Sequence, residues 1–181
     1  MPPALQDSFG ELGGRTVGLV GYGAVARALA RLLHAFECTV LVAARTPPPD
    51  QIRRSVPELL AESDIVSLHV PLTPETRHLI GRDALERMKP GAILINTARG
   101  GLVDQGALIA ALETGRLAGA GLDVFDPEPI ASRDPLLARP DVVVTPHAAW
   151  LTPETWRRSL DVAAENVRRL AAGEALLHRV A

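Results

Sequence analysis

The sequence has 181 residues, of which 47% are apolar and 22% charged, and its formal net charge is -2. These values are close to globular averages and exclude both a disordered chain and a coiled coil, while the length fits one domain of ordinary size. Aromatic residues make up only 3% of the chain and no basic patch occurs, which excludes a stacking platform for single-stranded nucleic acid.

The one cysteine, Cys38, excludes an internal disulfide and leaves no cysteine cluster that could bind a metal. Residues 1–15 lack the basic head and apolar stretch of a signal peptide, and no apolar run is long enough to span a bilayer. We therefore expect a cytoplasmic protein with no metal site, no membrane contact and no nucleic-acid partner.

The chain opens with a strand, a turn and a helix in close succession. A short apolar run at 16–20 predicts a strand, the glycine-rich segment 21–23 a turn, and the Ala/Leu-rich stretch 24–35 a helix. Residues 38–43 then predict a second strand, and the triple proline at 47–49 predicts a stiff loop. This order is that of a β-α-β unit.

Four further apolar runs alternate with helical stretches along the rest of the chain. The predicted strands lie at 65–70, 92–97, 118–124 and 142–145. Continuous apolar strands separated by helices predict a parallel sheet covered on both faces, that is, a Rossmann-type doubly wound α/β fold with three layers, α/β/α. We expect residues 1–181 to form a single dinucleotide-binding domain.

Two later helices have recognisable ends. One is predicted over 104–113, where the acidic Asp104 is a candidate cap and Gly115 follows the last turn. The other opens at Thr152 and continues as an amphipathic stretch to Leu170. The second helix is the longest predicted element.

The turn after the first predicted strand has the sequence Gly21-Tyr22-Gly23-Ala24-Val25-Ala26, which fits the pattern G-x-G-x-x-G/A. The first glycine permits a tight turn, the second lets the backbone approach a pyrophosphate, and the small third residue lets the helix pack closely on the strand. Free N–H groups at the helix N-terminus would then face the phosphates. The pattern predicts dinucleotide binding, although an ordinary glycine turn could have the same sequence.

The end of the second predicted strand bears on the choice of cofactor. An acidic residue at this place would bind the ribose 2′-hydroxyl of NAD, but Ala44, Arg45 and Thr46 occupy it. A guanidinium and a hydroxyl can hold a 2′-phosphate, so the sequence favours NADP slightly over NAD. The alternative is an exposed arginine beside a proline loop.

Three polar side chains follow three of the predicted strands: Arg99, Glu128 and His147. Ligands of open α/β sheets bind where strands end. A cation, a carboxylate and an imidazole suit hydride transfer to a carbonyl acid, because charge that builds on oxygen needs a cation and a proton donor nearby. Taken singly, Arg99 could form a surface ion pair and His147 a loop hydrogen bond, while Asp126 competes with Glu128 for the carboxylate role.

Four segments resemble a known family: VPLTPETRHLI at 70–80, INTARGGLVD at 95–104, GLDVFDPEP at 121–129 and TPHAAW at 145–150. In this order, with the glycine pattern first, they resemble the D-isomer-specific 2-hydroxyacid dehydrogenases. The likeness covers the coenzyme domain of that family, from about Leu12 to the end of the chain.

The resemblance implies a role for each catalytic candidate. Arg99 would bind the substrate carboxylate and polarise its carbonyl, His147 would donate and accept the proton, and Glu128 would hydrogen-bond the imidazole and favour its protonated form. The implied reaction is the interconversion of 2-hydroxy acids and 2-oxo acids. Asp123 would contact the nicotinamide, or else it would only cap a turn at a strand end.

The resemblance also enlarges the set of candidate cofactor-binding residues. Gly21, Gly23, Ala24, Val25 and Ala26 are joined by Ala44, Arg45, Thr46, Val70, Pro71, Thr76, Thr97, Ala98, Asp123, His147 and Ala149. His69, at the end of a predicted strand, is a further and weaker candidate for the adenosine side of the site.

Departures from the family pattern leave a second hypothesis open. Ala24 and Ala26 stand where members commonly have a basic residue and a glycine, which would remove one pyrophosphate contact. The Ala-Ala-Trp sequence that ends at Trp150 resembles the C-terminal-binding-protein corepressors of the same superfamily. The alternative function is therefore a nucleotide-sensing, corepressor-like interaction module without full catalysis.

Members of the family normally carry a substrate domain ahead of the glycine pattern, whereas only about fifteen residues precede the first predicted strand here. We therefore expect that the substrate domain is largely absent and that the isolated chain is weakly active or inactive. The resemblance also implies a homodimer, for which the apolar segment 135–138 is a candidate contact.

Overall fold

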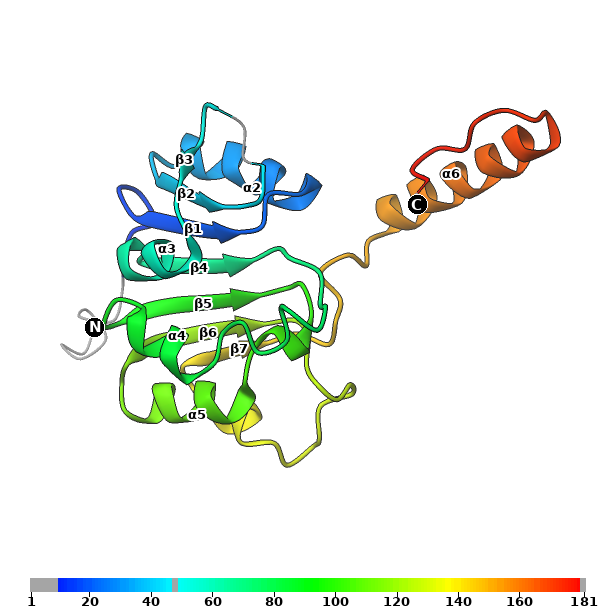
Figure 1. Ribbon diagram of the computed structural model, residues 1–181. Helices are drawn as coiled ribbons and strands as arrows, with labels where there is room; N and C mark the ends of the chain where they lie inside the picture. Colours follow the sequence, from blue (N-terminus) through cyan, green and yellow to red (C-terminus); the bar gives the residue numbers. More distant parts are fainter. Residues whose placement is uncertain (1–9, 47–48, 180–181) are drawn as a thin grey trace. The chain divides into compact units, whose positions relative to one another are not determined.

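The computed structural model describes residues 10–46 and 49–179. The chain forms two compact units, Met1–Pro146 and His147–Ala181. Pro47 and Pro48 of the predicted proline loop lie outside the described residues. The first unit contains a parallel sheet and the second a long helix, with the labels given in Figure 1.

The sheet has seven parallel strands in the order β3-β2-β1-β4-β5-β6-β7. The strands are β1 (Thr16–Val20), β2 (Thr39–Ala43), β3 (Ile52–Arg53), β4 (Ile65–Leu68), β5 (Ala92–Asn96), β6 (Leu117–Leu122) and β7 (Val142–Val144). The strand order reverses between β1 and β4, and ligands of doubly wound sheets bind at such a switch point. The predicted Rossmann-type sheet is thus confirmed.

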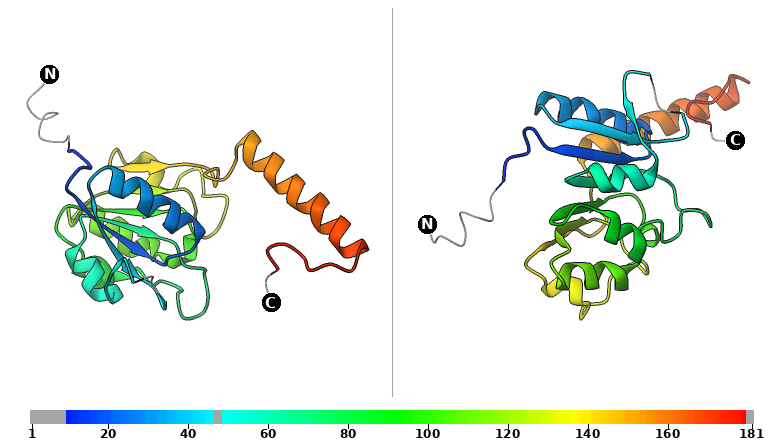
Figure 2. Two further views of the ribbon diagram at one scale, coloured as in Figure 1. Left: turned by 90° about the horizontal axis from the view of Figure 1, so that it is seen from above. Right: turned by 60° about the vertical axis from the view of Figure 1, so that its left-hand side comes forward.

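Helices cover both faces of the sheet, as Figures 1 and 2 show. They are α2 (Ala24–Ala35), α3 (Val56–Glu62), α4 (Arg82–Arg87) and α5 (Gln105–Glu113). On one face, Ala30 of α2 belongs to a cluster with Val17 and Val40. On the other face, Leu59 of α3 and Leu108 of α5 belong to the larger core cluster. Burial of β1, β2 and β4 between two helical layers explains their continuous apolar runs, whereas Ile93 of β5 and Val143 of β7 are exposed.

The predicted elements agree with the observed ones to within about two residues. The helix predicted over 24–35 has these bounds in the structure, and Asp104 caps α5 by accepting a hydrogen bond from the Ala107 N–H at 3.0 Å. The apolar segment 135–138, considered above as a dimer contact, forms the 3-10 helix η2 (Pro135–Ala138). Its Leu136 is buried in the core of the chain itself.

The second unit contains α6 (Pro153–Ala171), capped by the Thr152 hydroxyl, which accepts from the Thr155 N–H at 3.1 Å. No residue of α6 is buried. Its end is tied to the tail because Asn166 makes two hydrogen bonds with the Leu177 backbone, at 2.7 and 3.2 Å. Among the described residues, no helix is long and apolar enough to cross a membrane.

Candidate functional site

The turn after β1 is closed by backbone contacts. The Gly21 N–H donates to the Ala43 carbonyl at 2.8 Å, and Gly21 has a φ of 96°. A Cβ at this position would lie 2.5 Å from the His69 carbonyl oxygen. Because that neighbour is backbone and cannot give way, only glycine fits here.

The second glycine of the turn faces empty space. A Cβ added to Gly23 would meet nothing within 4 Å, and no side chain caps α2, whose N-cap residue is Gly23. Ala26 is fully buried where α2 meets the sheet. An uncapped helix N-terminus beside an open cradle fits the pyrophosphate of a dinucleotide, because its free N–H groups bind anions.

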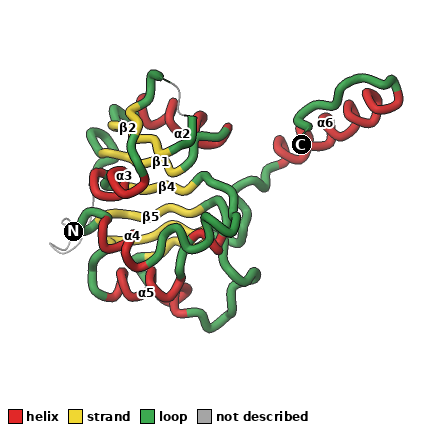
Figure 3. The backbone as a smooth tube through the Cα atoms, viewed as in Figure 1, coloured by secondary structure: helices red, strands yellow, loops and turns green. Residues whose placement is uncertain are grey.

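A hollow of about 730 Å³ lies at the carboxyl ends of β1, β4 and β5, where the loops of the first unit gather (Figure 3). Its lining includes the predicted cofactor residues Gly23, Ala24, Val25, Ala26, Val70, Pro71, Thr97 and Ala98. Arg99 and His69 also line it. The structure therefore brings the glycine turn and one catalytic candidate to a single hollow at the switch point.

The predicted ribose-binding residues follow β2. Ala44 is half-buried, while Arg45 and Thr46 are exposed, and none of them lines the hollow. Within the part of the chain that the structure describes, Arg45 has no hydrogen bond or ion pair, whereas Asp50 accepts a hydrogen bond from Gln51 at 3.2 Å. The Arg45 guanidinium is therefore available to an anion, and its role in cofactor choice stays a prediction.

The Thr76 side chain forms hydrogen bonds within the loop that contains Pro71. Its hydroxyl donates to the Pro71 carbonyl at 2.7 Å and accepts from the Thr73 N–H at 2.7 Å. These bonds order the loop beside the hollow, but Thr76 does not line it.

His69 lies at the inner wall of the hollow. Its Nε2 is 2.9 Å from the hydroxyl of the buried Ser67, and burial lowers the pKa of the imidazole. A neutral ring is therefore favoured at this position.

Asn96, the last residue of β5, organises the turn that leads to Arg99. Its side-chain amide donates to the Arg99 carbonyl at 2.9 Å and accepts from the Ala98 N–H at 3.1 Å. The Arg99 side chain is exposed, and its Nη1 donates to the Ala98 carbonyl at 2.6 Å. Sequence reasoning overlooked Asn96, although a polar residue at the end of an apolar strand was a usable signal.

Asp123 is buried just past the end of β6, with 3% of its surface exposed. Its N–H donates to the Asn96 carbonyl at 3.0 Å, and its carboxylate accepts from the Thr145 hydroxyl at 2.5 Å. Asp123 therefore joins neighbouring strand ends, whatever it contacts in the cofactor. The predicted contact with the nicotinamide stays a prediction.

The two candidate carboxylates after β6 have different partners. Asp126 accepts from the Arg77 guanidinium at 3.0 Å, and both side chains are about half exposed. Glu128 is exposed and accepts from the Phe125 N–H at 2.9 Å. The choice of Glu128 over Asp126 as the carboxylate of the site stays a prediction.

His147 is the first residue of the second unit. It has a φ of 53° and is half-buried, and the nearby Ala149 is exposed. Its predicted pairing with Glu128 and its contact with the cofactor stay predictions.

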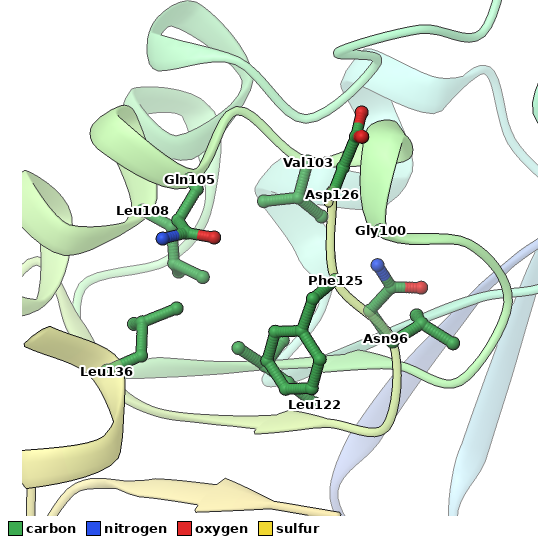
Figure 4. A pocket seen from close by; sticks show the side chains of 10 residues that line it. Asn96, Gly100, Val103, Gln105, Leu108, Leu122, Phe125, Asp126 and Leu136 are labelled. Carbon is green, nitrogen blue, oxygen red and sulfur yellow. The ribbon is translucent and has the colours of Figure 1, made fainter. Parts of the chain in front are cut away.

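A much smaller cavity of about 20 Å³ lies beside the turn at Gly100. Figure 4 shows the side chains of Asn96, Phe125 and Asp126 along its wall. It has room for about one water molecule, so it is not a substrate pocket. Among the described residues, no group of three or more His, Cys, Asp or Glu side chains is placed to hold a metal ion.

Together, the fold and the hollow define a Rossmann-type dinucleotide-binding domain. Residues 4–149 match the family model of the D-isomer specific 2-hydroxyacid dehydrogenase, NAD binding domain. The chain belongs to this family, which confirms the resemblance of the four sequence segments and the NAD(P)-binding class of the domain.

Proteins similar to this chain include named dehydrogenases and reductases. A glyoxylate reductase from Korarchaeum cryptofilum is 49% identical over 173 residues, which cover 89% of this chain and 50% of that protein. A D-lactate dehydrogenase with NAD+ from Lactobacillus jensenii superposes with a TM-score of 0.89 at 34% identity, covering all of this chain and 59% of the other. D-mandelate dehydrogenase from Rhodotorula graminis superposes with a TM-score of 0.93 at 33% identity, covering 98% of this chain and 54% of the other.

The chain thus spans about half the length of the curated relatives it matches. Those relatives support the dehydrogenase hypothesis and give no support to the corepressor-like alternative.

Proposed function

We propose that the chain is the NAD(P)-binding half of an oxidoreductase that interconverts 2-hydroxy acids and 2-oxo acids. The observation that carries this proposal is the 730 Å³ hollow, because it joins the glycine turn to Arg99. A guanidinium beside a dinucleotide cradle is suited to a substrate with a carboxylate next to its carbonyl. Glyoxylate, hydroxypyruvate and pyruvate are substrates of this class, and several relatives are named glyoxylate reductase.

The cofactor, when bound, supplies or accepts a hydride. Arg99 then binds the substrate carboxylate and stabilises the negative charge that builds on the carbonyl oxygen. His147 donates a proton to that oxygen in reduction and accepts it in oxidation. Glu128 orients the imidazole and favours its protonated form.

NADP is the favoured cofactor in this proposal because Arg45 and Thr46 follow β2 where a carboxylate would select NAD. The test is a parallel titration of the purified chain with NADPH and NADH, followed by nucleotide fluorescence. The variant Arg45→Asp should weaken NADPH binding about 10-fold or more by charge repulsion, while NADH binding stays within about 3-fold.

The matched control for this titration is Arg82→Asp, the same charge change at an exposed residue that opens α4. It should leave both affinities unchanged. Binding of neither nucleotide by the wild-type chain would refute the proposed function.

We also propose that residues 1–181 act as one dinucleotide-binding domain and that full activity needs a substrate domain beyond them. The hollow is open, so charges in it are exposed to water and electrostatic help is weak. The purified chain should therefore bind nucleotide but reduce glyoxylate slowly, and rapid turnover would contradict this. A cytoplasmic location and a homodimer complete the proposal, the dimer being testable by sedimentation.

A further inference from the structure

The ends of the neighbouring strands β5, β6 and β7 are joined by hydrogen bonds through Asn96, Asp123 and Thr145, which we call the strand-end network. We propose that this network positions the catalytic candidates, and that the Thr145 hydroxyl is a positioning residue for the reaction. The inference rests on the proposed function.

The register of the sheet places the three residues side by side. Asn96 of β5 pairs with Leu122 of β6, which pairs with Val144 of β7. Asp123 and Thr145 are therefore the first residues beyond neighbouring strands at one level of the sheet. Parallel strands lie about 5 Å apart, so short side chains can connect them.

The bonds of the network run without a gap from β5 to β7. The Asn96 carbonyl accepts from the Asp123 N–H at 3.0 Å, and the Asp123 carboxylate accepts from the Thr145 hydroxyl at 2.5 Å. Thr145 is fixed a second time because its N–H donates to the Leu122 carbonyl at 2.9 Å. At the other end, the Asn96 amide holds the backbone of Ala98 and Arg99.

Each member of the network lies shortly before one catalytic candidate in the chain. Asn96 precedes Arg99 by three residues, and Thr145 precedes His147 by two. Asp123 leads to Glu128, whose carboxylate accepts from the Phe125 N–H. The hydrogen bonds of the strand-end network therefore hold the backbone at the strand ends that lead to the catalytic candidates.

Two of the three members of the network are buried. Asn96 is 1% exposed and Asp123 is 3% exposed, whereas Thr145 is exposed. The loss of a partner is costly for a buried polar group such as the Asp123 carboxylate. Without the Thr145 hydroxyl, the Asp123 carboxylate loses one short hydrogen bond and the end of β7 loses its side-chain tether. A displacement of about 1 Å at a catalytic group can cost about 100-fold in rate.

The test compares Thr145→Val, which keeps the branched shape, with Thr145→Ser, which keeps the hydroxyl. Thr145→Val should lower kcat for glyoxylate reduction about 10- to 100-fold with little change in KM. Thr145→Ser should keep at least about a third of wild-type kcat. The control Thr114→Val removes a hydroxyl that only caps α5, by donating to the Ala110 carbonyl at 3.0 Å, and should leave kcat unchanged.

The outcomes separate this inference from the proposed function. An active wild-type chain whose Thr145→Val variant keeps full kcat would refute the inference alone. Equal losses in Thr145→Val and Thr145→Ser would also refute it, because the methyl group would then matter rather than the hydroxyl. A wild-type chain that binds neither NADPH nor NADH would refute the proposed function and this inference together.

Discussion

The two compact units of the chain stabilise themselves in different ways. The first buries a large set of apolar side chains between its sheet and its helices. In the second, α6 has an apolar face at helical spacing, yet Trp156, Leu160, Val167 and Leu170 are all half or more exposed. The nucleotide-binding unit thus has its own core, while the contacts described in the unit that begins with His147 are ion pairs, hydrogen bonds and one pair of Trp rings, Trp150 and Trp156.

This difference between the units indicates that nucleotide binding can be tested separately from proton transfer. Most of the proposed cofactor-binding residues lie in the first unit, which has its own core. The proposed proton donor, His147, is the first residue of the second unit, in which no residue of α6 is buried. Substitutions matched between the two units make the difference measurable.

The largest expected effect is on stability. Leu94 is fully buried in the core, and Leu94→Ala should lower the free energy of unfolding by about 2–5 kcal/mol. Leu160, on α6, is 63% exposed, and Leu160→Ala should change the free energy of unfolding by less than about 0.5 kcal/mol. Urea denaturation measures both, and a large loss in Leu160→Ala would show that α6 is covered in solution.

The next effect separates binding from chemistry. Arg99→Ala should reduce the rate of glyoxylate reduction about 100- to 1,000-fold, because a cation at the developing oxyanion is lost, while NADPH affinity stays unchanged. His147→Gln should lower kcat comparably through loss of the proton donor. Steady-state kinetics and nucleotide titration measure these effects. His178→Gln, a histidine change in the same unit, should leave kcat unaltered, and a parallel loss there would contradict the assignment.

Removal of a helix cap should have a smaller effect on stability, and each unit contains one cap that can be tested. Ser55 caps α3 in a capping box with Glu58, whose carboxylate accepts from the Ser55 N–H at 2.8 Å. Ser55→Ala should cost about 1 kcal/mol in the free energy of unfolding. Thr152→Ala removes the cap of α6 and should lower the helical content without moving the main denaturation midpoint. A shifted midpoint in Thr152→Ala would show that the units unfold together.

The smallest effect is a pH dependence of α6. Hydrogen bonds from Arg168 and then Arg169 lower the pKa of Glu165 from 4.5 to about 2. A folded-state pKa below the unfolded value stabilises the helix above the unfolded pKa, and the stabilisation is lost as the pH falls through the folded pKa. Circular dichroism should therefore show α6 losing helicity between pH 4.5 and 2, and less steeply in Glu165→Gln.

Most of the fold could be predicted because buried strands leave continuous apolar runs. The exception is β3, since Ile52 and Arg53 are both exposed and carry no pattern. The capping box that begins α3 was readable as Ser55-x-x-Glu58 but was not used.

The candidate site was less predictable than the fold. The glycine turn and Arg99 followed from local sequence and lie at one hollow. The link between Asp123 and Thr145 could not be predicted, because it depends on the register of β6 against β7. The ion pair between Asp126 and the distant Arg77 likewise could not be predicted, because no local pattern indicates that partner.

The two glycines of the cofactor turn differ in how freely they can change during evolution. Position 21 is closed to any residue with a Cβ by the His69 backbone, whether or not the protein uses a nucleotide. Position 23 has empty space around it, so only the bound phosphates would keep a glycine there. A related protein that no longer binds the cofactor should therefore keep Gly21 but tolerate other residues at position 23. Comparison of the two positions would indicate whether a related protein still binds a dinucleotide.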